Sequence, residues 1–165
     1  MIKIIFANIE NELTGATTTI LNTVQTAAQA SIKNYLRAVA EKNRDIVSAF
    51  YAEYAAGRLT EKEAKAAARK VLFSQPIGET GYIYCLDSNG TAIEHPLASV
   101  AGVNFSGFEF VGEQVRRKEG YLEYEWQNPG DAQPRSKALY MTYFKPWDWI
   151  ISVSSYRDEF RKLIN

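Results

Sequence analysis

The chain has 165 residues, which is enough for one domain with a hydrophobic core and too few for two comfortable domains. Aromatic residues make up 13% of the chain, which excludes a disordered tail. The 19 basic and 19 acidic residues cancel, so no nucleic-acid partner is expected. One cysteine, Cys85, and one histidine, His95, exclude an internal disulfide and are too few for a zinc site. We therefore expect no metal and no cofactor.

Residues 4–56 have the spacing of a long helix. They contain no proline, and their apolar residues recur mostly at steps of three, four or seven. A helix of about 50 residues would be about 75 Å long, far more than such a domain is wide. Its first half must therefore project, pair with another chain or bend. The threonine-rich stretch 14–19 is the candidate bend, and Gly57 is expected to end the helix.

A second helix is predicted to begin at Thr60 and to run to about Phe73. Thr60 and Glu63 have the spacing of a capping box, in which each satisfies a free backbone N–H of the other. Pro76 and Gly78 close this helix.

The segment 82–86 is short and rich in aromatic and β-branched residues, which predicts a half-buried strand. Asn89 and Gly90 supply the positive φ angles of a tight turn. The segment 91–95 is then predicted to return as a second strand, which Pro96 ends.

The rest of the chain predicts more strands for the same sheet. After a short helical segment at 108–118, three strands are predicted at 121–127, 136–144 and 149–155, followed by a helix from 156. Strands joined by short turns must pair antiparallel. We therefore predict an α+β domain with five antiparallel strands and the long helix covering one face.

Four segments, in this order, resemble the single-module Cache sensor domains, which are extracytoplasmic ligand-binding domains of bacterial chemoreceptors and sensor histidine kinases. The segments are GYIYCLDSNGTAIEHP, GVNF, GYLEYEWQNPG and SKALYMTYFKPWDWIISVSSYRDEF. The resemblance implies a PAS-like antiparallel sheet with a small-ligand pocket on one face. It also implies a division into a long N-terminal helix (1–58), a Cache ligand-binding domain (59–160) and the start of an exit helix (161–165).

The resemblance also implies which residues line the pocket. By their place in the family motifs they are Tyr82, Tyr84, His95, Trp126, Lys137 and Tyr140. Short carboxylates such as acetate, propionate or pyruvate are common ligands of the family. One departure is the final strand, where Ser152–Ser155 replaces a glycine-containing segment and could narrow the pocket or add hydrogen bonds.

Each of these residues also has a simpler interpretation. A strand lysine such as Lys137 is usually a solvated edge charge, His95 could be a structural histidine, and the aromatic residues could be core. Lys137 and Tyr140 are three residues apart, so in a regular strand they face opposite sides. Both can line one pocket only if a bulge lies between them.

These features predict a periplasmic sensor domain of an inner-membrane receptor that binds a small carboxylate. The resemblance implies membrane segments before and after it in the full protein; no run of about 20 apolar residues occurs within this chain. We expect a homodimer through the N-terminal helix. An enzyme is not expected, since no nucleophile elbow, metal spacing or phosphate loop is present. The alternative is a structural dimerisation module of a receptor without a ligand.

Overall fold

The computed structural model describes residues 2–164, with side chains for residues 7–160. The chain divides into two compact units, Met1–Ile32 and Lys33–Asn165. Helix α1 (Ile2–Ala55) runs through the first unit and into the second. It is continuous through the candidate bend at 14–19, where the Thr18 and Thr19 hydroxyls donate to carbonyls four residues earlier, at 2.9 and 3.0 Å.

The ends of the first two helices are as predicted. Gly57 follows α1 with a φ of +77°, and its N–H donates to the Tyr54 carbonyl at 2.9 Å. Helix α2 (Glu61–Phe73) begins with the capping box. The Glu63 N–H donates to Thr60 Oγ1 at 3.1 Å, and the Thr60 N–H donates to Glu63 Oε1 at 3.0 Å.

Four strands form one antiparallel sheet in the second unit, in the order β1-β4-β3-β2. The antiparallel pairing that the short connections predicted is confirmed. The remaining elements, in chain order, are β1 (Tyr82–Leu86), α3 (Glu109–Arg117), β2 (Gly120–Trp126), β3 (Arg135–Phe144), a 3-10 turn (Lys145–Trp147), β4 (Trp149–Tyr156) and α4 (Arg157–Ile164).

The prediction of five strands is wrong, because the segment 91–95 does not form a strand. It touches β1 through a single bridge between Glu94 and Cys85. The backbone of Ala92 pairs instead with residues 102–103, at 2.8 and 2.9 Å. The loop that follows folds back, and its backbone makes the hydrogen bonds with Ala92 that a hairpin partner would have made. Alternation within 91–95 could not reveal this pairing with the loop.

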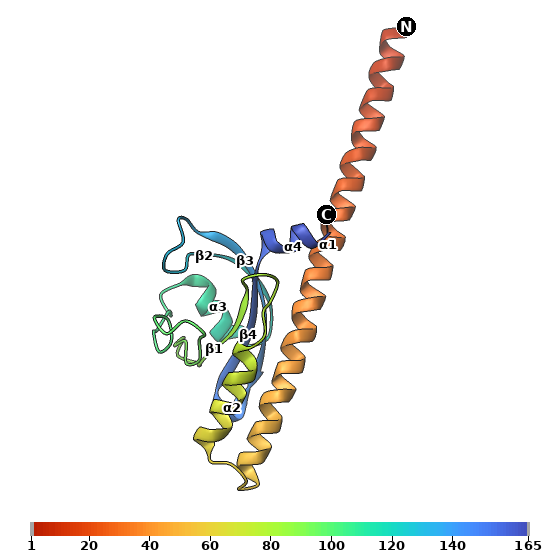
Figure 1. Ribbon diagram of the computed structural model, residues 1–165. Coiled ribbons are helices and arrows are strands. Elements are labelled where there is room, and N and C mark those ends of the chain that lie inside the picture. The colour runs from red at the N-terminus through yellow and green to blue at the C-terminus, as the bar shows by residue number, and fades with distance from the viewer. Residues whose placement is uncertain (1, 165) are drawn as a thin grey trace. The chain divides into compact units, whose positions relative to one another are not determined.

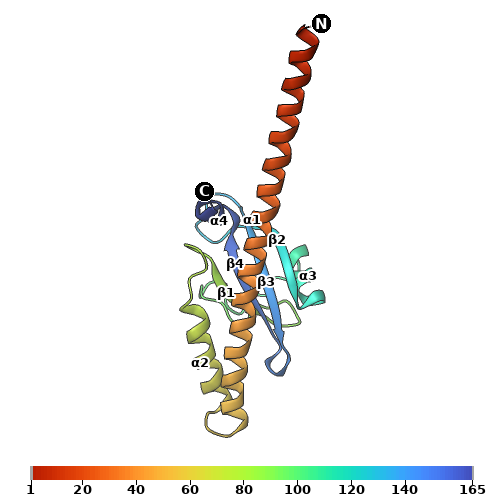
Figure 2. The ribbon, with the colours of Figure 1, turned by 90° about the vertical axis from the view of Figure 1, so that its right-hand side faces the viewer.

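The two faces of the sheet have different covers (Figures 1 and 2). The part of α1 within the second unit packs on one face, where the Thr142 hydroxyl donates to the Ala40 carbonyl at 3.4 Å. Helix α2 lies beside it (Figure 2), and the amides of Asn43 and Gln75 bond to each other there. Helix α3 and the loop before it cover the other face. The core of this second face consists of Tyr84, Leu86, Ala92, Val100, Val111, Leu139, Met141 and Ile150.

Candidate functional site

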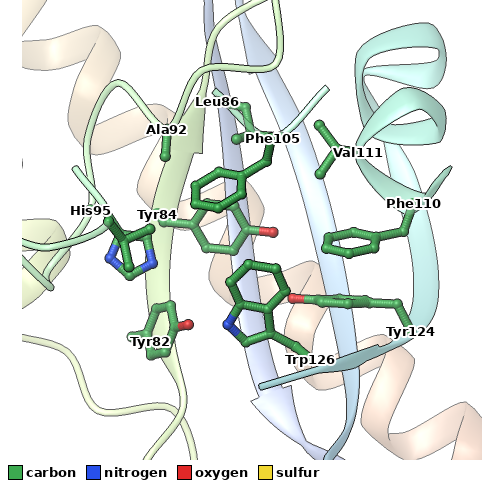
Figure 3. Close-up of a pocket in the computed structure, with 11 residues that line it drawn as sticks. Tyr82, Tyr84, Leu86, Ala92, His95, Phe105, Phe110, Val111, Tyr124 and Trp126 are labelled. Carbon is green, nitrogen blue, oxygen red and sulfur yellow. The ribbon is translucent and has the colours of Figure 1, made fainter. Parts of the chain in front are cut away.

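A small cavity of about 30 Å³ lies on the α3 face of the sheet (Figure 3). By a comparable measure one water molecule needs about 10–15 Å³, so the space suits a molecule of few atoms. Most of its wall is aromatic or aliphatic. The lining residues are Tyr82, Tyr84, Leu86, Ala92, His95, Val100, Phe105, Phe110, Val111, Tyr124 and Trp126.

The structure brings together four of the six predicted site residues at this cavity: Tyr82, Tyr84, His95 and Trp126. β1 supplies the two tyrosines from alternate positions, β2 supplies the tryptophan, and the segment after β1 supplies the histidine. The fifth residue, Lys137, does not itself line the cavity. Its Nζ lies 4.0 Å from the centre of the Tyr82 ring, which does.

The sixth residue, Tyr140, is not at the cavity. β3 pairs with β4 without interruption from Lys137 opposite Tyr156 to Phe144 opposite Trp149, so no bulge re-aims either side chain. Alternate residues of a regular strand point to opposite faces. Lys137 therefore faces the α3 side with Leu139, and Tyr140 faces the α1 side.

Lys137 is not a solvated edge charge, because β3 lies inside the sheet and the side chain is fully buried. Among the side chains of residues 7–160, its Nζ is one of two buried polar atoms without a hydrogen-bond partner. The rings of Tyr156 and Tyr124 lie 4.8 and 6.0 Å from it. Burial lowers the pKa of Lys137 to about 7, and repulsion from Arg135 adds to this effect.

His95 offers a neutral donor to the cavity. Its Nδ1 accepts the N–H of Leu97 at 3.0 Å, which leaves the proton of the neutral ring on Nε2. Its ring lies 5.0 Å from that of Tyr82. Burial lowers the pKa of His95 to about 4, and the charge of Lys137 lowers it further, so the imidazole is neutral at pH 7.

An ion pair of the neighbouring residue, Glu94, fixes the segment that carries His95. The carboxylate of Glu94 is almost fully buried and accepts two hydrogen bonds from the Arg69 guanidinium of α2. Such a bidentate pair is directional as well as strong. It ties the residue before His95 to α2.

A buried polar chain lies behind the cavity, and the sequence interpretation missed its central residue, Gln114. This fully buried amide donates to the Tyr84 hydroxyl at 3.1 Å and to Ser152 Oγ at 3.0 Å. Ser152, at the departure from the family pattern, is thus bonded within the core and does not line the cavity. Gln114 lies one helical turn after Phe110, and a polar residue on this apolar face was the signal that could have identified it.

The aromatic wall also includes Phe105 and Phe110, which the sequence analysis did not predict for the site. Phe110 stacks on Tyr124 with 4.1 Å between ring centres, and Phe105 meets Trp126 edge-on at 5.4 Å. In Figure 3 these rings surround the space toward which the hydroxyls of Tyr84 and Tyr124 point. Burial raises the pKa of both hydroxyls, so they act as neutral groups.

Comparison with known proteins assigns this chain to a family. The sequence pattern of the Cache domain matches residues 2–165. The chain belongs to the Cache domain family. This Cache domain is a ligand-binding sensor domain of the kind found outside the cytoplasm in chemoreceptors and sensor histidine kinases.

Two curated relatives illustrate those receptor classes. The methyl-accepting chemotaxis protein McpP of Pseudomonas putida KT2440 is 29% identical in an alignment 143 residues long, which covers 74% of this chain and 26% of that protein. The sensor histidine kinase MctS of Rhizobium johnstonii 3841 is 24% identical in an alignment 148 residues long, which covers 84% of this chain and 32% of that protein. This Cache domain therefore spans about a quarter to a third of their length.

Solved structures agree with the fold. A periplasmic sensor domain of a chemotaxis protein has a TM-score of 0.69 and 26% identity, over 79% of this chain and 98% of that one. A Cache chemosensory domain that recognises carboxylic acids has the same TM-score and 23% identity, over 81% and 98%. No helix in the described part of this Cache domain combines the length and the apolar character that crossing a bilayer requires.

Proposed function

We propose that this Cache domain binds a small monocarboxylate, of the acetate, propionate and pyruvate class, in the cavity beside Lys137. The observation that carries the proposal is a fully buried amine without a partner, next to a small aromatic cavity. A buried charge is costly unless it is paired. A carboxylate offsets that cost by accepting a charge-assisted hydrogen bond, which is stronger than a neutral one.

The other residues of the cavity have roles that suit such a ligand. His95 Nε2–H is a second donor for the carboxylate, and the rings of Tyr82, Phe105 and Trp126 surround its short apolar part. Because Lys137 Nζ lies against the Tyr82 ring, binding requires a shift of the ammonium group, the ring or both.

The cavity is poorly suited to larger or doubly charged ligands. None of its lining residues, all in the described part of the chain, is acidic, so the ammonium group of an amino acid would lack a partner. A dicarboxylate would bring a second charge into an aromatic wall that holds no second cation.

The comparisons support this proposal at the level of the class. One Cache chemosensory domain of the same fold recognises carboxylic acids, and the two curated relatives are a chemoreceptor and a sensor kinase. We accordingly assign this chain to the periplasmic, ligand-sensing part of an inner-membrane receptor, with membrane segments on both sides of it.

Thermal unfolding in the presence of small acids tests the proposal. Acetate, propionate and pyruvate are expected to raise the melting temperature, because a ligand at 100 times its Kd stabilises the folded state by about 2.7 kcal/mol. For a domain of this size that corresponds to a shift of roughly 5–10 °C. Acetamide, which has the size of acetate without its charge, is the matched control, and glycine and succinate test the selectivity.

An absence of any shift with the three monocarboxylates contradicts the proposal, and so does an equal shift with acetamide. The first result is the one that the alternative predicts, namely a dimerisation module without a ligand.

We further propose that the first helical unit pairs with a second copy of the chain. Ile9, Leu13, Ile20 and Val24 follow one another at steps of four, seven and four, which places them within about 60° on one face of α1. About half or more of each side chain is exposed, Leu13 and Ile20 by 63% each. A row of exposed apolar residues on a long helix is typical of a helix–helix interface.

The double variant Leu13→Asp/Ile20→Asp is therefore expected to be monomeric in sedimentation velocity at concentrations at which the wild type is a dimer. Thr18→Asp/Asn22→Asp adds the same charge on the opposite side of the helix and should leave the dimer intact. A monomeric wild type, or a dimer that tolerates both pairs of substitutions equally, would show that this face is not the interface.

A further inference from the structure

Asn128, two residues after the end of β2, binds three aromatic side chains with one amide. Its Oδ1 accepts the hydroxyl of Tyr82 at 3.2 Å and the indole N–H of Trp126 at 2.7 Å. Its Nδ2 donates to the hydroxyl of Tyr156. The loop itself is held by the Asn128 N–H, which donates to Asp131 Oδ2 at 2.9 Å. Side chains from β1, β2 and β4 thus converge on one residue.

These bonds fix the orientation of the rings around the lysine. Tyr82 and Tyr156 are the two rings closest to Lys137 Nζ, at 4.0 and 4.8 Å. A buried hydroxyl or indole N–H without a partner is destabilising. The hydrogen bond from each ring to the Asn128 amide therefore stabilises that ring in its observed position. An apolar side chain in place of Asn128 would release all three rings at once.

Trp126 lines both the small cavity and a larger groove. An open groove of about 720 Å³ lies next to the small cavity, and both are lined by Val100, Phe105 and Trp126. Asn128 lies in the wall of the groove. The indole therefore forms part of the boundary between the cavity and the groove, and its bond to Asn128 holds it there.

We propose that Asn128 is the positioning residue of the ligand site. Its amide keeps Tyr82 and Tyr156 around Lys137 and keeps Trp126 between the cavity and the open groove, through which the ligand enters and leaves. The effect on ligand exchange rests on the proposed function, whereas the effect on the rings is present without any ligand.

The first test therefore uses the unliganded 165-residue chain labelled with 5-fluorotryptophan. Its three tryptophans give three fluorine resonances, and Trp126→Phe identifies the relevant one. Asn128→Leu, which is similar in size but apolar, and Asn128→Ala are expected to shift or broaden this resonance. Asn128→Asp keeps the accepting oxygen and should restore a sharp resonance near the wild-type position. Gln127→Leu is the control, because Gln127 bonds only the carbonyl of Asp131 within the same loop.

The second test uses acetate as the probe, with calorimetry for affinity and stopped-flow fluorescence for rates. Asn128→Leu is expected to weaken acetate binding at least tenfold, mainly through faster dissociation, while Gln127→Leu stays within twofold. A Trp126 resonance unchanged in both Asn128→Leu and Asn128→Ala overturns the proposal, and so do unchanged acetate rates in folded variants. If acetate does not bind the wild type, the proposed function fails and the fluorine spectra alone decide the role of Asn128.

Discussion

Replacing Lys137 with methionine is expected to weaken acetate binding by roughly 10- to 150-fold. A hydrogen bond to a charged group contributes about 1.5–3 kcal/mol, and every 1.4 kcal/mol is a factor of ten in Kd. The lost group is the buried amine beside the cavity, and none of the side chains that line the cavity, all in the described part of the chain, is a lysine or arginine. Isothermal titration calorimetry on both proteins measures the difference.

The same substitution should not unfold the domain. Methionine keeps most of the volume of the lysine stem, and exchanging a desolvated charge for an apolar group of similar size is often neutral or stabilising. The free energy of unfolding of the unliganded variant, measured in urea, is therefore expected to equal or exceed that of the wild type.

Tyr140→Phe is the matched control, because Tyr140 lies three residues along the same strand and faces the other side of the sheet. It should leave acetate affinity unchanged. Equal affinity in wild type and Lys137→Met, with both proteins folded, would contradict the assignment of the anion site to Lys137.

Four of the six residues that the family resemblance implied for the site do line the cavity, and local patterns predicted most of the strands and helices that carry them. Alternation showed that Lys137 and Tyr140 could share a pocket only across a bulge. Strand β3 is regular, so Lys137 and Tyr140 face opposite sides of the sheet, and the expectation that Tyr140 lines the cavity was wrong.

The features that escaped prediction depend on partners far away in the sequence. Segment 91–95 has the composition of a strand, but Ala92 within it pairs with the loop at 102–103. Only the tertiary structure shows whether the segment pairs with β1 or with this loop. Gln114 and Asn128 are ordinary as a helix residue and a turn residue. Their importance comes from side chains of other strands, 28 to 38 residues away in the clearest cases of Tyr84, Tyr156 and Ser152.

Acetate binding is expected to weaken roughly fivefold from pH 7 to pH 8 and about ninefold from pH 8 to pH 9. The pKa of Lys137 in the unliganded domain is lowered to about 7 by burial, and the anion binds the protonated amine. A bound carboxylate favours the charged form and raises this pKa, so binding takes up protons: about half a proton at pH 7 and roughly nine-tenths at pH 8. The ligand itself stays ionised throughout this range, since carboxylic acids have pKa values of about 4.

The other groups at the cavity do not titrate in this window. His95 has a pKa of about 4 and stays neutral, while burial raises the pKa of the Tyr82, Tyr84 and Tyr124 hydroxyls above their ordinary value of 10. Any proton uptake on binding between pH 7 and 9 that disappears in Lys137→Met therefore belongs to Lys137.

The stability of the unliganded domain should change in the opposite direction. Lys137 has a folded pKa of about 7 and an unfolded pKa of about 10.5, so between these values the unfolded chain binds more protons than the folded one. Stability then rises with pH, by up to about 1.4 kcal/mol per pH unit relative to Lys137→Met. Urea unfolding from pH 7 to 9 measures this slope, and calorimetry in buffers of different ionisation enthalpy measures the proton uptake. Constant acetate affinity over this range, without proton uptake, would mean that Lys137 is already charged before the ligand arrives.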